Sequence, residues 1–335
     1  NNEFIKPGFD DSKWQSVTVP HDWAIYGPFS SLNDKQEVAI SQDGQKEAME
    51  HAGRTGGLPF VGVGWYRTEF DVPQFQAGKR ATILFDGAMS HANVYINGQK
   101  VGYWPYGYNS FHFDITKYLK PGEKNTLAVR LENLPESSRW YPGAGLYRNV
   151  HLIITEDAYI PVWGTYITTP SVNEKFAKVN VRTKVVLPEG ADPAKYSVET
   201  SVWNPNKQKL TAVRTSLAQM KYNNNQAEQE FVIQAPSLWS PEMPALYSAE
   251  TRLYEGDKLK DIYTTPFGIR SIEIIPDKGF FLNGKRTVFK GVCNHHDLGP
   301  LGAAVNDAAI RRQIRILKDM GCNAIRTSHN MPAPE

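Results

Sequence analysis

The stretch GVCNHHDLGPLGAAVNDAAIRRQIRILKDMGCNAIRTSHN, at Gly291–Asn330, decides the fold of the C-terminal part of the chain. Its first residues continue an apolar run that indicates a strand. Ile310, Ile314 and Leu317 follow at helical spacing, with Arg and Lys on the other side, which predicts an amphipathic helix. A second apolar run at Asn323–Arg326 predicts another strand. Strand, helix and strand in this order form a βαβ unit, so we expect the two strands to be parallel.

Polar side chains follow both of these strands at the point where each strand ends. They are Asn294, His295, His296 and Asp297 after the first strand, and Arg326, Ser328 and His329 after the second. In βα architectures, binding and catalytic groups collect at the carboxyl ends of parallel strands. Taken singly, each of these residues is better explained as a solvated loop residue or a helix cap. Two neighbouring strand ends that both carry such groups favour a functional site.

A metal site is an alternative for the same residues. His295 and Asp297 are two positions apart on one strand face, and His329 could join them. Histidine and aspartate are residue types that bind zinc. The spacing is not specific, and the sequence offers no fourth ligand. We therefore predict that the site holds no metal, and the sequence predicts no other cofactor.

The chain up to about residue 155 is rich in short strands that alternate apolar and polar positions. This pattern holds in GWYRTEFDVP (Gly64–Pro73) and in FHFDITKYLKPGEKNTLAVRLEN (Phe111–Asn133). In HANVYINGQKVGYW (His91–Trp104), Asn97-Gly98 between two alternating runs predicts a tight hairpin, because both turn positions need a positive φ. Many short strands with little helix predict an antiparallel jelly-roll sandwich over residues 1–155.

Strand-like stretches continue between residues 156 and 270. A length near 110 residues with about seven strands is typical of an immunoglobulin-like sandwich, although the cysteine pair of antibody domains is absent. The pattern changes after Arg270, where the hairpin around Asn283-Gly284 leads into the βαβ stretch. The predicted chain is therefore mostly β, with boundaries at residues 1–155, 156–270 and 271–335.

Composition excludes several classes of protein. The 335 residues are 41% hydrophobic and 21% charged, which is typical of a globular protein with a substantial core. The formal net charge is only +2 and no basic cluster stands out, so nucleic-acid binding has no electrostatic support. No run of about 18 apolar residues exists, so we expect no membrane span. Cys293 and Cys322 form no disulfide framework and are expected to be free thiols.

Several stretches together resemble glycoside hydrolase family 2, the family of β-galactosidases, β-glucuronidases and β-mannosidases. They are VPHDWAIYGPF (Val19–Phe29), GWYRTEFDVP (Gly64–Pro73), SSRWYPGAGLYRNVHL (Ser137–Leu152), GFFLNGKRTVFKGVCNHHDLGPLGAAV (Gly279–Val305) and MGCNAIRTSHNMPAP (Met320–Pro334). The match covers the chain in the family's order and is closest in style to bacterial β-galactosidases. It implies a jelly-roll sugar-binding-like domain, an immunoglobulin-like sandwich and the start of a (β/α)8 TIM barrel, truncated at residue 335.

The resemblance implies roles for the residues at the strand ends. His295 matches a histidine that contacts the substrate near the transition state, and Asn294 precedes it at the same strand end. Arg326 matches an arginine that helps to set the ionisation of the nucleophile. His329 matches a histidine that hydrogen-bonds a sugar hydroxyl. Imidazole and guanidinium groups suit this work because they donate directed hydrogen bonds, which strengthen as oxocarbenium character develops.

The loop at Ser138, Arg139 and Trp140 matches a jelly-roll segment that reaches the mouth of the family's active site. We therefore count Arg139 and Trp140 among the candidate substrate-binding residues. Ser138 stands where some members of the family carry an acidic sugar ligand, so that role is not carried over. RWYPGAG is equally well explained as a structural loop whose glycines serve turns.

The catalytic carboxylates of the family are not matched in this chain. The family hydrolyses with retention, using two glutamates about 5 to 5.5 Å apart that belong to later barrel strands. The acid/base normally follows an Asn, but Asn2-Glu3 and Asn173-Glu174 fall in the wrong domains. Asp297 and Glu335 lie nearest the rim and neither matches. We therefore expect no catalytic residue in this chain, which would be an inactive fragment.

The expected function is that of the N-terminal part of a retaining exo-β-glycosidase, foremost a β-galactosidase, which releases terminal β-linked sugars from oligo- or polysaccharides. A β-glucuronidase or β-mannosidase of the same family is the near alternative. A non-catalytic carbohydrate-binding module and a metal-dependent barrel hydrolase are alternatives of other classes. The expected partner is a β-galactoside-like carbohydrate, and assembly into a homo-oligomer is left open. The sequence does not identify the compartment, for which a periplasmic or extracellular location is one candidate.

Overall fold

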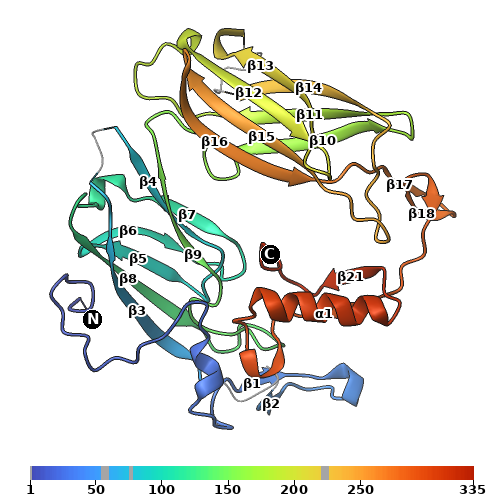
Figure 1. Cartoon of the computed structure of the whole chain (residues 1–335). Coiled ribbons are helices and arrows are strands. Elements are labelled where there is room, and N and C mark those ends of the chain that lie inside the picture. Colours follow the sequence, from blue (N-terminus) through green and yellow to red (C-terminus); the bar gives the residue numbers. More distant parts are fainter. Residues whose placement is uncertain (1, 54–59, 75–77, 220–225) are drawn as a thin grey trace. The chain divides into compact units, whose positions relative to one another are not determined.

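The computed structural model describes residues 2–53, 60–74, 78–219 and 226–335. They form two compact units, Asn1–Ile154 with Lys290–Glu335 and Thr155–Phe289, and strands dominate both (Figure 1). The domain boundaries predicted from the sequence stay predictions. No helix in the described ranges is long and apolar enough to cross a membrane.

A β-sandwich forms the larger part of the first unit, as predicted. Its two sheets have the strand orders β3-β8-β5-β6 and β7-β4-β9. The strands are β3 (Gly62–Asp71), β4 (Arg80–Phe85), β5 (Ala92–Ile96), β6 (Gln99–Trp104), β7 (Phe111–Asp114), β8 (Lys124–Asn133) and β9 (Val150–Thr155). The predicted hairpin turn joins β5 to β6, where Asn97 has φ 50° and Gly98 has φ 82°.

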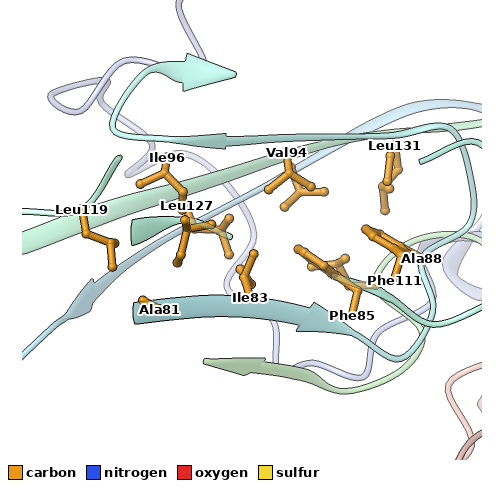
Figure 2. Close-up of a cluster of buried hydrophobic side chains, with 14 of the residues drawn as sticks. Ala81, Ile83, Phe85, Ala88, Val94, Ile96, Phe111, Leu119, Leu127 and Leu131 are labelled. Carbon is orange, nitrogen blue, oxygen red and sulfur yellow. The ribbon is translucent and has the colours of Figure 1, made fainter. Parts of the chain in front are cut away.

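The core of this sandwich follows from the alternation of each strand. Ile83 and Phe85 on β4 point toward Val94 on β5 and Leu131 on β8, and all four are buried (Figure 2). Phe111 on β7 stacks on Phe85 with ring centroids 4.9 Å apart. The inner face of every strand is therefore committed to packing, which leaves the loops at its ends to carry function.

The second unit is also a sandwich, with sheets β10-β11-β14 and β13-β12-β15-β16. Its strands are β10 (Thr165–Val172), β11 (Phe176–Lys184), β12 (Tyr196–Trp203), β13 (Lys209–Ser216), β14 (Gln226–Gln234), β15 (Tyr247–Glu255) and β16 (Lys258–Phe267). The predicted immunoglobulin-like sandwich is thus confirmed. A small sheet of β17 (Ile272–Ile275), β18 (Gly279–Leu282) and β19 (Lys285–Arg286) follows, and Asn283-Gly284 makes its predicted turn.

The predicted βαβ unit is present in the first unit. β20 (Gly291–Asn294) and β21 (Ala324–Thr327) are parallel, and α1 (Asp307–Asp319) lies between them in the chain. The side chain of Asn306 caps α1 by accepting a hydrogen bond of 3.0 Å from the backbone N–H of Ala309. The two predicted strand ends therefore meet at one edge of a small parallel sheet.

A hairpin and six short 3₁₀ helices complete the described elements. They are β1 (Gln36–Val38) and β2 (Met49–His51), with η1 (Trp23–Tyr26), η2 (Ser41–Asp43), η3 (Thr116–Tyr118), η4 (Pro193–Lys195), η5 (Leu217–Gln219) and η6 (Gly299–Leu301). Cys293 and Cys322 are free, as predicted.

One buried carboxylate ties the βαβ segment to the sandwich, and we call its contacts the Asp22 junction. Asp22 is 1% exposed. Its Oδ1 accepts hydrogen bonds from the backbone N–H groups of Ala24 (3.0 Å) and Ala144 (3.1 Å). Its Oδ2 accepts from the Ala303 N–H (2.8 Å) and the Tyr141 hydroxyl (2.7 Å). Three segments that are far apart in the sequence thus converge on one side chain.

Two glycines leave room for this junction. Gly143 has φ 72° and Gly302 has φ 57°, conformations that side chains rarely adopt. A Cβ atom at Gly302 would collide with Oδ2 of Asp22, and one at Gly143 would collide with Ala303. Burial raises the pKa of Asp22, and its four hydrogen bonds act in the opposite direction.

His296 packs against two tyrosines of the sandwich, Tyr108 and Tyr147. Its ring meets Tyr108 edge-on with centroids 5.0 Å apart, and Tyr147 at 6.0 Å. Its Nε2 lies 3.0 Å from the carbonyl oxygen of Pro142, so the neutral ring donates from this nitrogen. Burial lowers the pKa of His296 to about 4, because the imidazolium would lose its water.

We predict that α1 and β21 exchange their amide hydrogens faster than the sandwich strands β5 and β8. No residue of α1 is buried, and Ile314 and Ile325 are 46% and 41% exposed. Full burial of such a side chain stabilises the fold by roughly 1.5 to 3 kcal/mol, and a side chain that stays this exposed contributes only part of that free energy. Hydrogen exchange on the chain measures this directly. Equal protection of α1 and β5 in a monomeric sample would contradict the prediction.

We predict that the free energy of unfolding falls as the pH drops from about 6.5 to about 4. The unfolded chain binds a proton at His296 near pH 6.5, whereas the folded chain resists it down to about pH 4. The loss from this group is about 3 kcal/mol. Denaturant titrations across this range should show a steeper loss for the wild type than for His296→Gln, which has no such proton. Parallel curves would contradict the assignment.

Candidate functional site

Three aromatic rings meet at the strand ends, and we call them the ring cluster: Trp140, His295 and His329. Trp140 stacks on His329 with centroids 4.7 Å apart and planes 22° apart. His295 lies 5.6 Å from Trp140 and 5.3 Å from His329. Three of the six candidate residues, drawn from two domains of the predicted architecture, are therefore brought together.

Hydrogen bonds on the sandwich side fix the position of Trp140. Its Nε1 donates to the Tyr108 hydroxyl over 3.1 Å, and the Ser138 hydroxyl donates to its backbone carbonyl over 2.6 Å. Burial raises the pKa of Tyr108 to about 12, so its hydroxyl stays protonated. Ser138 therefore has a structural role in this loop. Tyr108 was missed by the sequence reasoning, since no periodicity or motif marks a contact between residues 32 positions apart.

The loop that carries His329 is anchored on both sides. The backbone N–H of buried Ser328 donates to the Asn294 carbonyl over 2.7 Å, which joins the two strand ends. Arg148, which is 5% exposed, donates from Nη2 to the Met331 carbonyl over 2.8 Å. Its Nη1 also donates to the Tyr108 carbonyl over 2.9 Å. One buried guanidinium therefore connects the sandwich to the backbone just beyond His329.

His295 carries an unused polar atom. Its Nδ1 is buried and has no hydrogen-bond partner among the described residues. A buried nitrogen in this state costs about 1 to 3 kcal/mol when nothing pairs with it. Such a nitrogen within the ring cluster suits a ligand that supplies the missing hydrogen bond.

Arg326 lies on a face of the small sheet that α1 does not cover. Its Nη1 is 3.9 Å from the sulfur of Cys293, its neighbour in register on β20. Alternate residues of a strand point to opposite faces, so Ile325 and Thr327 point the other way. Arg326 and Arg139 are both exposed, and no ring contact, hydrogen bond or ion pair among the described residues joins either to the ring cluster.

A pocket of about 360 Å³ lies on the opposite face of the small sheet. Its walls include Asn294, Ile325 and Thr327 from the strand side and Ile310 and Ile314 from α1. The pocket also reaches His295 of the ring cluster and Arg148 of the sandwich, so it adjoins the ring cluster. Asn294 thus lines this pocket, and its carbonyl makes the strand-end contact.

Asp297 and Glu335, the carboxylates closest to the rim in sequence, both line this pocket together with His295. Glu335 accepts a 2.6 Å hydrogen bond from the side-chain amide of Asn149. Asp297 is half-buried beside His296. In the ranges that the structure describes, no group of three or more His, Cys, Asp or Glu residues could hold a metal ion. The ring cluster therefore offers stacking surface and hydrogen-bond donors.

Models of three domains of one family match the chain in order. The sugar binding domain of glycosyl hydrolases family 2 matches residues 54–156, the family's next model matches 159–270, and its TIM barrel domain matches 273–335.

Individual relatives agree with these models. β-Galactosidase BoGH2A of Bacteroides ovatus is 43% identical over 331 residues, which are 98% of this chain and 37% of that protein. A β-glucuronidase of Bacteroides fragilis is 34% identical over 281 residues, covering 80% of this chain and 40% of that protein. The crystal structure of a β-glycosidase from Bacteroides vulgatus superimposes with a TM-score of 0.86 at 32% identity, covering all of this chain and 40% of that one.

The chain thus spans about two fifths of the length of these relatives. The matching domains follow one another in the same order as the jelly-roll-like sandwich, the immunoglobulin-like sandwich and the βαβ segment of the structure. The chain belongs to glycosyl hydrolases family 2, of which it carries the sugar-binding domain, the immunoglobulin-like domain and the first strands of the TIM barrel.

Proposed function

We propose that this chain is the N-terminal part of a retaining exo-β-glycosidase and forms one wall of its active site. The observation that carries the proposal is the ring cluster, in which Trp140 of the sandwich stacks on His329 beside the unpaired Nδ1 of His295. A sugar presents an apolar face of C–H groups and a rim of hydroxyls. The ring cluster offers a matching aromatic surface and matching polar nitrogens.

In the proposed mechanism, these residues bind the sugar that is released. The imidazoles of His295 and His329 hydrogen-bond its hydroxyls, and these bonds strengthen as positive charge develops on the ring. Arg326, on the face that α1 leaves open, holds a neighbouring carboxylate in its ionised form, because a cation nearby lowers a carboxyl pKa. Trp140 packs against the sugar and excludes water from one side.

The reaction itself needs two carboxyl groups about 5 to 5.5 Å apart. One attacks the anomeric carbon while the other protonates the departing oxygen. Water then releases the sugar from the covalent intermediate with the second group acting as base. We assign both carboxyl groups to segments of the protein outside residues 1–335, and we assign binding and orientation to this chain.

We propose a terminal β-galactoside as the substrate, since the relative that is 43% identical is named a β-galactosidase. A β-glucuronide is the second candidate, because a relative at 34% identity is named a β-glucuronidase. A β-mannoside is the third alternative within the family. A panel of aryl β-glycosides assayed on the protein that contains this chain distinguishes them. Turnover of none of them would refute the proposed function.

In that longer protein, we predict that His295→Ala, Arg326→Ala and His329→Ala each reduce kcat/KM by the equivalent of about 2 to 4 kcal/mol. None of the three side chains belongs to a hydrophobic core, so the variants should fold. Arg312→Ala, on the exposed side of α1, is the matched control and should behave as the wild type. Near-normal kinetics in all three variants would show that these residues do not bind the substrate.

For the chain of residues 1–335 alone, we predict no hydrolysis of chromogenic β-galactosides and only weak binding of galactosides in calorimetry. The proposed carboxyl groups are absent from it, and acid/base and nucleophile act as a unit. Robust turnover would disprove our assignment of those groups to other segments. Tight binding without turnover, retained after Trp140→Ala, would instead favour a carbohydrate-binding module.

A further inference from the structure

A second pocket, of about 380 Å³, borders the ring cluster, and we call it the hairpin pocket. Its walls are Gln36, Glu37 and Val38 of β1 and the loop Glu136–Trp140. Trp140 belongs to both sites, because it lines the hairpin pocket and stacks on His329 of the ring cluster. A ligand that fills both sites would therefore extend past one aromatic side chain.

The two walls of the hairpin pocket are joined by buried polar side chains. Gln36 is 3% exposed and donates from Nε2 to the Ser138 carbonyl over 2.6 Å. Asp34 is 6% exposed and accepts from the backbone N–H of Glu136. Ser138 in turn holds the carbonyl of Trp140. These contacts fix β1 against the loop, so the pocket exists before any ligand arrives.

The charges around the hairpin pocket select among ligands. Glu37, Glu136 and Arg139 line it and all three are exposed, which gives two carboxylates and one guanidinium. Carboxylates accept hydrogen bonds from hydroxyl groups and repel anions. The pocket volume falls in the range of small-molecule sites. Neutral polyhydroxylated molecules therefore suit it better than uronic acids or phosphates.

We propose that the hairpin pocket binds the leaving-group sugar, the residue from which the terminal sugar is cleaved, and that it selects a neutral sugar. The inference rests on the proposed function, in which the ring cluster holds the terminal sugar. The next sugar along the chain must then lie beside the ring cluster, and the hairpin pocket occupies such a place across Trp140. Glu37 accepts hydrogen bonds from the hydroxyls of this sugar, while Asp34 and Gln36 position the loop.

The test compares two substrates on the longer protein: the β-glycosyl fluoride of the sugar that it cleaves, galactosyl or glucuronyl, and that sugar β-linked to glucose. The fluoride has no leaving-group sugar and does not use the hairpin pocket. In Glu37→Gln, we expect kcat/KM for the disaccharide to fall about tenfold relative to that for the fluoride, the effect of one weakened hydrogen bond to a charged group. Glu47→Gln, on the same hairpin but outside the pocket, is the matched control.

A second comparison tests the charge selection. The wild type should prefer glucose to glucuronic acid as the leaving sugar, and Glu37→Gln should narrow this preference. Equal effects of Glu37→Gln on disaccharide and fluoride, or no effect on either, would overturn the inference while leaving the proposed function intact. Failure of the wild type to cleave any fluoride would overturn the proposed function, and the leaving-group site with it.

Discussion

The buried carboxylate of Asp22 is the contact on which the described site depends. Its two oxygens accept four hydrogen bonds from three separate segments, and Ala303 and Ala144 belong to the two segments that carry the site. A buried carboxylate without partners is unfavourable by several kcal/mol, so each donor is needed. The loop with Trp140 and the segment after β20 are thereby tied to the same point, and the ring cluster can form between them.

The site is therefore a composite of two domains. The sandwich contributes Trp140, held by Tyr108, and the strand ends contribute His295 and His329. Arg148 adds a second tie, from the sandwich to the backbone beyond His329. In the function proposed above, this division gives the sandwich a role beside the first barrel strands: its loops complete one wall of the site, and β1 adds the proposed place for the leaving sugar.

The sequence predicted the elements better than their contacts. The helical spacing of Ile310, Ile314 and Leu317 identified α1, and Asn-Gly pairs identified two hairpin turns. The order strand, helix, strand predicted the parallel pairing of β20 with β21. Polar residues at strand ends pointed to His295 and His329 because parallel strands place their ends together.

The contacts that hold the site were not predictable in the same way. Asp22 lies 281 residues from its partner Ala303, and nothing in the local sequence relates them. Arg326 and Arg139 do not join the ring cluster, and this also has a physical cause. Arg326 sits within a strand, where alternation turns it to the opposite face from Ile325, and Arg139 is exposed while Trp140 beside it is anchored to Tyr108.

The most direct test of this account is hydrogen exchange at single amides in Asp22→Asn. The variant keeps the shape of the side chain, but its NH2 group replaces one oxygen and faces N–H donors instead of accepting from them. We expect the amides of Ala144 or Ala303 to lose protection, together with those of β20 and β21, while β5 and β8 keep theirs. If β20, β21 and Ala303 stayed as protected as in the wild type, Asp22 would not be what holds the site together.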